Sequence, residues 1–252
     1  MTDLADDAAL ARKIADAAGA LLIALQRSGR LAGAALGKEG DRAANALIVA
    51  ALRAERPDDA ILSEEEAADM SRLTSSRVWI VDPLDGTREY SEGRTDWAVH
   101  VALAVDGTAA VGAVARPALD ATYCSADCPS PPAYAGRLRM VISRTRPAAE
   151  ALAVADALDA ELIPMGSAGA KAMAVVRGEA DIYLHAGGQY EWDNCAPTAV
   201  AQAAGLHVSR IDGSPLRYNQ ESPWLPDLLI CPKPLAAQIL ALIAADVAPD
   251  PR

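Results

Sequence analysis

The first part of the chain shows two kinds of apolar pattern. Residues 3–29 predict a helix with one apolar face, made of Leu10, Ile14, Leu21 and Leu25. Residues 37–40, which begin and end with glycine, predict a break before a second helix that Pro57 ends. Strands are predicted at residues 60–62 and 78–81, and residues 97–115 predict a β-hairpin with an Asp-Gly turn.

The second part of the chain alternates between the two patterns. The predicted elements are a strand at 138–142, a helix at 148–158, a strand near 162, a helix at 170–177, a strand at 181–184, a helix at 194–204, strands near 208 and at 228–231, and a helix at 235–245. Strands grouped first and alternating elements later favour stacked α and β layers with mixed sheets. Residues 125–132 contain three prolines and are the predicted linker between an N-terminal half, 1–124, and a C-terminal half, 133–252, within one compact unit.

The amino-acid composition excludes some classes of binding partner and of cellular location. With 34 acidic and 23 basic residues, the net charge of −11 argues against binding to a nucleic acid polymer or to an anionic membrane. No apolar run reaches the roughly 18 residues of a membrane span, and the acidic N-terminus does not resemble a secretory signal. Four scattered cysteines predict neither a disulfide scaffold nor a zinc site. The sequence therefore predicts a cytoplasmic protein.

One motif directly follows the predicted strand at 78–81. Residues 82–87 read Asp-Pro-Leu-Asp-Gly-Thr, which places Asp82 and Asp85 three residues apart at the end of a buried strand. Gly86 permits a tight turn close to a ligand, and the carboxylates offer the hard oxygen ligands that Mg²⁺ prefers. A simple β-turn is the alternative interpretation, because Asp, Pro and Gly are common turn residues.

Three other acidic positions have equally simple alternatives. Ser63 and Glu66 have the spacing of a capping box, in which Glu64 would only decorate the first turn of a helix. Asp193, before an alanine-rich helix, and Asp41, at the start of the second predicted helix, each have the position of a helix N-cap. The combination of these acids, more than any one of them, indicates a metal site.

Together these motifs resemble the inositol monophosphatase-like family of Mg²⁺-dependent, lithium-sensitive phosphatases. In that family a Glu-Glu pair follows a strand, an Asp-Pro-(Leu/Ile)-Asp-Gly-Thr motif comes next, and Trp-Asp lies nearer the C-terminus. This chain has Glu64-Glu65, residues 82–87 and Trp192-Asp193 in that order, and a further family block matches residues 166–168. The resemblance covers about residues 10–245. It implies the layered α/β/α/β/α sugar-phosphatase fold with mixed sheets, and often a homodimer.

The resemblance also implies roles for individual residues. Glu64, Asp82 and the Leu84 carbonyl would bind one Mg²⁺, and Asp82, Asp85 and Asp193 would bind a second, with Asp82 bridging; two or three ions are expected in all. Asp41 and Thr87 would position the attacking water. The segment before Asp41 departs from the family pattern, because it is short and has no threonine.

Several further cues resemble the bacterial CysQ-like branch, whose members hydrolyse 3′-phosphoadenosine 5′-phosphate to AMP in sulfate assimilation. They are residues 62–65, 88–90, 142–145 and 191–193. Lys171 also matches that branch, and a lysine there would pair with a second phosphate. The implied substrate contacts are Gly86, Thr87, Ser143, Arg144, Ser167, Lys171 and Asp193. The alternative for Arg144 and Lys171 is an ordinary exposed cation.

Three functions remain open on the sequence alone. The first is a nucleotidase acting on 3′-phosphoadenosine 5′-phosphate. The second is an inositol monophosphatase or fructose-1,6-bisphosphatase of broad specificity with the same metal chemistry. The third is a non-catalytic protein that binds a phosphorylated metabolite, which would be expected to lack at least one of the metal ligands, whereas all of them are present here.

Overall fold

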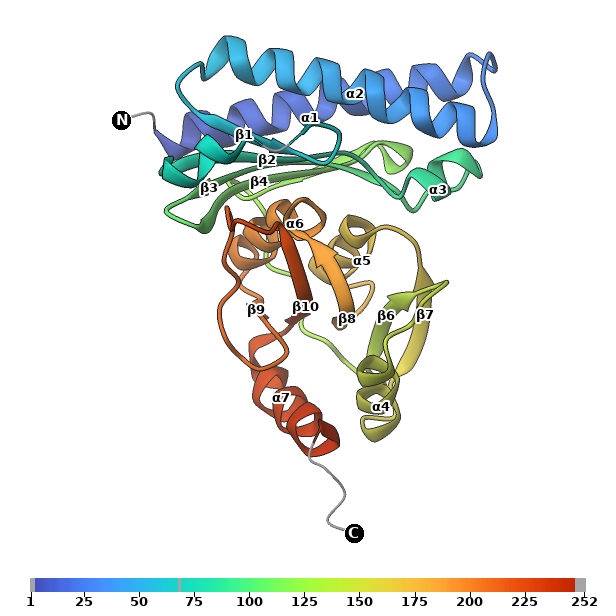
Figure 1. Ribbon diagram of the computed structural model, residues 1–252. Helices are drawn as coiled ribbons and strands as arrows, with labels where there is room; N and C mark the ends of the chain where they lie inside the picture. The colour runs from blue at the N-terminus through green and yellow to red at the C-terminus, as the bar shows by residue number, and fades with distance from the viewer. Residues whose placement is uncertain (1–2, 68, 248–252) are drawn as a thin grey trace.

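The computed structural model describes residues 3–67 and 69–247, which form five stacked layers. A pair of long helices covers one sheet, a second pair of helices lies under that sheet, a second sheet follows, and two more helices cover its far side (Figure 1). Three apolar cores fill the spaces between these layers. The α/β/α/β/α fold expected from the sequence is therefore confirmed.

The first two layers come from the N-terminal part of the chain. The outer helices are α1 (Leu4–Arg27) and α2 (Gly33–Glu55). The sheet beneath them has the order β1-β2-β3-β4-β5, with β1 (Ala60–Ser63), β2 (Arg77–Asp85), β3 (Ala98–Val105), β4 (Thr108–Arg116) and β5 (Ala121–Cys124). Short helices η1 (Met70–Thr74), α3 (Thr87–Ser91) and η2 (Pro117–Leu119) lie in its connections. The predicted hairpin is β3–β4, and β5, α3, η1 and η2 were not predicted.

The remaining layers come from the rest of the chain. The second sheet has the order β7-β6-β8-β10-β9, in which β6 is parallel to β7 and β8 while β10 is antiparallel to β8 and β9. Its strands are β6 (Arg139–Ser143), β7 (Glu161–Met165), β8 (Ile182–Tyr190), β9 (His207–Ser209) and β10 (Trp224–Cys231). Helices α5 (Ala168–Val176) and α6 (Glu191–Ala203) lie between the sheets, and α4 (Ala149–Ala157) and α7 (Lys233–Val247) lie outside.

The predicted break at residues 37–40 is wrong, because α2 runs through it without interruption. A Cβ on Gly37 would lie 2.8 Å from Thr87 Cγ2, and a Cβ on Gly40 would lie 3.0 Å from Tyr90 Cε1. These glycines therefore allow α2 to approach α3 closely, and do not end a helix. The same continuity puts Asp41 in the middle of α2 and not at its start.

Two other predicted helix starts are also wrong. Ser63 ends β1 and is followed by a turn, so Ser63 and Glu66 do not form a capping box at the start of an α-helix. Helix α6 begins at Glu191, three residues earlier than predicted, so Asp193 lies inside its first turn. There its carboxylate accepts a hydrogen bond from the backbone N–H of Tyr190, the residue that caps the helix.

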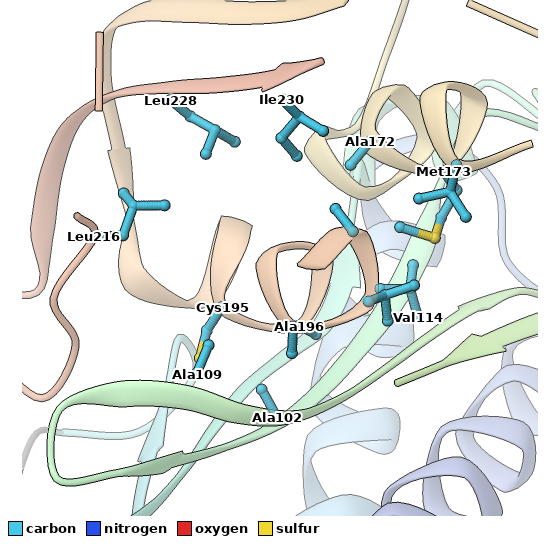
Figure 2. Packing of buried hydrophobic residues seen from close by; sticks show 14 of the residues in the cluster. Ala102, Ala109, Val114, Ala172, Met173, Cys195, Ala196, Leu216, Leu228 and Ile230 are labelled. Carbon is cyan, nitrogen blue, oxygen red and sulfur yellow. The ribbon is translucent and has the colours of Figure 1, made fainter. Parts of the chain in front are cut away.

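The core between the first sheet and α6 is made of small side chains. Ala102 and Ala109 on the hairpin face Cys195 and Ala196 on α6, while larger residues such as Leu228 close the other side of the helix (Figure 2). The chain has no phenylalanine, and this interface contains small side chains where many protein cores have aromatic ones. Within the described residues, no helix is both long enough and apolar enough to span a membrane.

Gly112 on β4 sets how closely α6 can approach. A Cβ there would lie 2.5 Å from the Ala196 carbonyl oxygen and 2.9 Å from Ala199 Cβ. We expect Gly112→Ala to lower the free energy of unfolding by about 1–3 kcal/mol, because backbone must move to admit the methyl group. Urea unfolding measures the change. Ala110→Val, at a half-buried site on the same strand, is the control and should have little effect.

Candidate active site

Strand β2 ends in the protein interior with two carboxyl groups. Asp82 is 1% exposed and Asp85 is 6% exposed. Asp82 pairs with His100 and Asp85 with Ala98, so three steps along β2 match only two along β3. Residues three apart on a regular strand face opposite sides, and this irregularity brings both carboxyl groups to the same side. The Leu84 backbone N–H also donates to Asp82 Oδ1, at 3.0 Å.

Asp193 completes this group from a distant part of the chain. Carboxylate oxygens of Asp82, Asp85 and Asp193 all lie within 4.8 Å of one another. The first turn of α6 holds Asp193, whose Oδ2 accepts a 2.6 Å hydrogen bond from the Tyr190 N–H. Pro197 lies within the same helix, one turn farther on. The structure thus brings together three of the residues that the sequence predicts as metal ligands.

Burial and mutual repulsion raise the pKa values of most of these acids. The pKa of Asp82 lies well above its usual value because the group is buried beside Glu64, Asp85 and Asp193. Burial and the charge of Asp85 raise the pKa of Asp193 to about 6. Glu64 is exposed as a residue, yet burial of its carboxyl group and the charges of Asp193 and Asp85 raise its pKa to about 7.

Asp85 differs because helix α5 begins against it. Its carboxylate accepts hydrogen bonds from the Ser167 hydroxyl, from the Ala168 N–H at 3.0 Å and from the Gly169 N–H at 2.6 Å. His100 Nε2 lies 3.2 Å away. Burial alone would raise the pKa of Asp85, but His100, Ser167 and the helix N-terminus hold it well below its usual value.

Such a set of side chains fits a divalent cation. Converging carboxylates are the ligands that Mg²⁺ and similar hard cations use, and a cation would offset the repulsion that raises the pKa values of Asp82, Glu64 and Asp193. The Leu84 carbonyl accepts a hydrogen bond from Thr87 Oγ1 at 3.1 Å. Metal binding by Glu64 and by the Leu84 carbonyl remains a prediction.

Asp41 and Thr87 lie together beside the acidic cluster. Thr87 Oγ1 is 3.2 Å from Asp41 Oδ2, although the two residues are on different helices. Asp41 is only 8% exposed, and its other oxygen, Oδ1, is buried without a hydrogen-bond partner in the described structure. Burial and the charges of Glu65 and Glu64 raise the pKa of Asp41 to about 7. An unpaired carboxylate oxygen with that pKa is suited to accept a proton from water.

A cavity of about 560 Å³ opens from Asp85 and Asp193. The implied substrate contacts Gly86, Thr87, Ser143, Arg144, Ser167 and Lys171 all line it. Lys171 is 5% exposed, so the alternative of an exposed cation is wrong for this residue. Its ammonium group donates to the carbonyls of Gly166 at 2.9 Å and Ser167 at 2.6 Å. Burial lowers the pKa of Lys171 to about 8.

Arg144 is in the same cavity but already has anionic partners. It donates to Glu89 Oε1 and to Glu92 Oε2, each at 2.7 Å. Its guanidinium group is therefore neutralised by two carboxylates. The neighbouring Ser143 Oγ also has a partner, because it accepts a 3.1 Å hydrogen bond from the backbone N–H of Arg146. Contact of Ser143 and Arg144 with a substrate remains a prediction.

A second cavity, of about 590 Å³, lies on the other side of Thr87. Asp41, Lys38 and Glu65 line it, and Thr87 and Arg88 line both cavities. Helices α1 and α2 are separated only by residues 28–32, so no long loop covers Asp41. The short segment noted before Asp41 in the sequence thus corresponds to an open side of the site.

Sequence reasoning missed three residues of the site. His100, which the sequence analysis did not assign to the site, is fully buried, and its Nε2 lies 3.2 Å from Asp85 Oδ2 while its Nδ1 lies 3.0 Å from the Trp192 carbonyl. Tyr183 and Arg146 line the cavity that opens from Asp85 and Asp193. The signal for His100 is its register opposite Asp82, which becomes visible only once the pairing of β2 with β3 is known.

Known proteins share this fold and this sequence. Residues 6–247 match the inositol monophosphatase family. A 3′-phosphoadenosine 5′-phosphate phosphatase of Mycobacterium leprae is 50% identical over 94% of this chain and 93% of its own length. The 3′(2′),5′-bisphosphate nucleotidase CysQ of Escherichia coli is 32% identical over 67% of this chain and 74% of its own length.

A solved structure agrees with these matches. CysQ from Bacteroides thetaiotaomicron, described as a bacterial member of the inositol monophosphatase family, superposes with a TM-score of 0.76 at 27% identity. The superposition covers 90% of this chain and 97% of that one. From residue 6 to residue 247, then, in sequence and in fold alike, this chain belongs to the inositol monophosphatase family.

Proposed function

We propose that this protein is a Mg²⁺-dependent phosphomonoesterase that removes the 3′-phosphate of 3′-phosphoadenosine 5′-phosphate to give AMP, in sulfate assimilation. The observation that carries the proposal is the convergence of Asp82, Asp85 and Asp193 beside a cavity that also contains cationic side chains. Such a cavity suits a phosphorylated metabolite, and the 50% identical relative is a phosphatase for this nucleotide.

The proposal includes two metal positions. Glu64, Asp82 and the Leu84 carbonyl would hold one Mg²⁺, and Asp82, Asp85 and Asp193 would hold the other. When bound, the ions would neutralise the phosphate, lower the pKa of the attacking water and stabilise the leaving oxygen. Asp82 would contribute to both positions, so its loss would be more damaging than the loss of any other of these acids.

Asp41 and Thr87 prepare the nucleophile in this mechanism. The Thr87 hydroxyl orients a water molecule beside Asp41, and the unpaired Oδ1 of Asp41 takes the proton as the water attacks phosphorus. The cavity that opens from Asp85 and Asp193 receives the leaving group on the other side of Thr87. Attack and departure thus occur on opposite sides of the phosphate, as an in-line displacement requires.

Organisation and location complete the proposal. Residues 1–124 provide the first four acids and residues 133–252 provide Asp193 and the main substrate contacts, and the two halves act as one unit. The segment between them runs from β5 in the first sheet to β6 in the second. The four cysteines are all unpaired, which supports a cytoplasmic location.

The variant Asp82→Asn tests the metal site. It should lower kcat by several orders of magnitude, because it removes a ligand shared by both metal positions. Phosphate release from 3′-phosphoadenosine 5′-phosphate measures the loss. Asp106→Asn, on an exposed hairpin turn, is the control and should keep full activity. Substantial activity in a folded Asp82→Asn protein would contradict the site assignment.

The raised pKa values predict a pH-dependent effect of Mg²⁺ on stability. Glu64 and Asp41 have folded-state pKa values of about 7, above the roughly 4 of carboxyl groups in an unfolded chain, so the metal-free fold loses stability as pH rises from about 4 to about 7. Bound Mg²⁺ would offset the negative charge that appears when these protons are lost. The rise in Tm on adding Mg²⁺ should therefore be small at pH 5.5 and several degrees larger at pH 7.5. A pH-independent rise would count against this electrostatic account.

Substrate preference tests the identity of the leaving group. We expect kcat/KM for 3′-phosphoadenosine 5′-phosphate to exceed that for inositol 1-phosphate and fructose 1,6-bisphosphate by about a hundredfold or more, which corresponds to about 2.7 kcal/mol. Phosphate release under identical Mg²⁺ concentrations gives the three values. Comparable values would instead support the broad-specificity phosphatase.

A further inference from the structure

Glu191 is a fully buried acid in the first turn of α6, two residues before Asp193. Its Oε2 accepts a 2.6 Å hydrogen bond from the backbone N–H of Asn219, and its Oε1 accepts a 2.8 Å bond from that of Gln220. The backbone N–H of Glu191 donates to the Pro223 carbonyl at 2.8 Å. Three hydrogen bonds thus hold the start of α6 against the segment that leads into β10.

Arg72, in η1 of the N-terminal half, binds the same segment and is almost fully buried. Its guanidinium group donates to the Asn219 side-chain oxygen at 2.7 Å and to the Gln220 carbonyl at 2.8 Å. The Asn219 side-chain N–H donates in return to the Arg72 carbonyl, also at 2.8 Å. A buried cation and a buried anion therefore meet on one short stretch of backbone, where Arg72 binds oxygen atoms and Glu191 binds N–H groups.

This arrangement, which we call the clamp, consists of Arg72, Glu191, Asn219 and Gln220. It joins two segments that each carry an acid of the site. Arg72 lies in the connection between β1 and β2, which begins at Glu64. Glu191 lies in the helical turn that contains Asp193. The clamp therefore connects the first half of the chain to the turn through which the second half contributes its acid.

Asp193 depends on such a connection more than the other acids do. Asp82 and Asp85 belong to one strand, so the sheet sets the distance between them. Asp193 reaches them from a separate helix. The first sheet also holds this turn through a 3.0 Å contact between His100 Nδ1 and the Trp192 carbonyl. The clamp adds hydrogen bonds one residue earlier in the same turn, and these fix how the helix begins.

The clamp is built from buried charges, although apolar side chains would fill the same space. Removing Arg72 and Glu191 from water costs free energy, and buried opposite charges often stabilise a fold no better than apolar packing does. Their hydrogen bonds are directional, however, and therefore fix one arrangement of the groups that they join. The composition of the clamp thus suits the positioning of a nearby group better than it suits added stability.

We propose that the clamp positions Asp193 for metal binding: Arg72 and Glu191 hold the first turn of α6, so that the Asp193 carboxylate stays within reach of a cation bound at the end of β2. The inference rests on the proposed function and deepens it, because it concerns the second of the proposed metal positions. Arg72 and Glu191 are positioning residues that act through the backbone segment between them. Loss of either charge should therefore weaken Mg²⁺ binding although every proposed ligand is still present.

Mg²⁺ binding in the absence of nucleotide tests the clamp. The increase of Tm with Mg²⁺ concentration gives an apparent Kd for the wild type and for Glu191→Gln, whose side chain can accept from only one of the two backbone N–H groups. Glu191→Gln should raise this Kd about tenfold, as loss of a group that supports a metal ligand typically does. The matched control is Asp7→Asn, which disrupts equally buried ion pairs with Arg56 and Arg77 at the opposite end of β2. It should lower the metal-free Tm without changing the Kd.

A milder variant tests the clamp without removing a buried charge. Asn219→Gly deletes the side chain that pairs with Arg72, and glycine suits the left-handed backbone of this residue, whose φ is 59°. It should raise the apparent Kd severalfold. In the double variant with Glu191→Gln, the Kd should rise by less than the product of the two single effects, because both act through one segment. Effects that multiply would contradict a shared action.

An apparent Kd that is unchanged in Glu191→Gln, or that rises equally in Asp7→Asn, would overturn the inference. Phosphate release from 3′-phosphoadenosine 5′-phosphate separates this failure from failure of the proposed function. If the wild type binds Mg²⁺ but releases no phosphate, while Glu191→Gln still raises the Kd, the function is wrong and the clamp stands. If the wild type is active and Glu191→Gln binds Mg²⁺ as tightly as the wild type does, the function stands and the clamp is wrong.

Discussion

Negative charge concentrated at the end of β2 is the constraint on which the rest of this structure depends. Asp82, Asp85 and Asp193 have carboxylate oxygens within 4.8 Å of one another in a buried place, and Glu64 adds a fourth charge nearby. Like charges so close together in a medium of low dielectric constant are unfavourable unless bound protons or cations neutralise them. The raised pKa values of Asp82, Glu64 and Asp193 are the direct expression of that cost.

Within the described residues, one of these acids has several donors, whereas Asp82 and Asp193 each accept a single backbone hydrogen bond. Asp85 receives two backbone N–H groups of α5, the Ser167 hydroxyl and His100. The N-terminus of a helix is suited to this because its N–H groups have no partners within the helix. The other acids have no comparable set of donors. The site is thus built with one anchored carboxylate and several that depend on an added cation.

The parts of the site that the sequence predicts well are those governed by local rules. A buried apolar strand followed by Asp82 and Asp85 specifies where two carboxyl groups must lie, since the sheet fixes the strand end. Gly37 and Gly40 were misread because their role depends on α3, which packs against them from a distant position in the chain. The partners of Arg144 were equally inaccessible, because Glu89 and Glu92 lie more than 50 residues away from it.

The role of His100 in the site also could not be predicted from the sequence, because it depends on long-range contacts. Its contacts with Asp85 and the Trp192 carbonyl join the first sheet to α6, and neither contact follows from its neighbours in the sequence. Long-range pairing of strands decides which side chain faces Asp82, and a shift of one residue in the register would have turned His100 away. The resemblance to a family identified the acidic residues of the site from the sequence. His100 could be identified only from the pairing of β2 with β3 in the structure.

Pro197 has a consequence for how Asp193 is held. Proline has no N–H to donate, so the carbonyl of the residue four positions earlier, which is Asp193, lacks its usual donor within α6. The first turn of this helix is therefore tied less firmly to the second than in an uninterrupted helix. Asp193, the acid from the second half of the chain, therefore lies in a turn that lacks one helical hydrogen bond. Its backbone can adjust slightly, while the sheet fixes the carboxyl groups on β2.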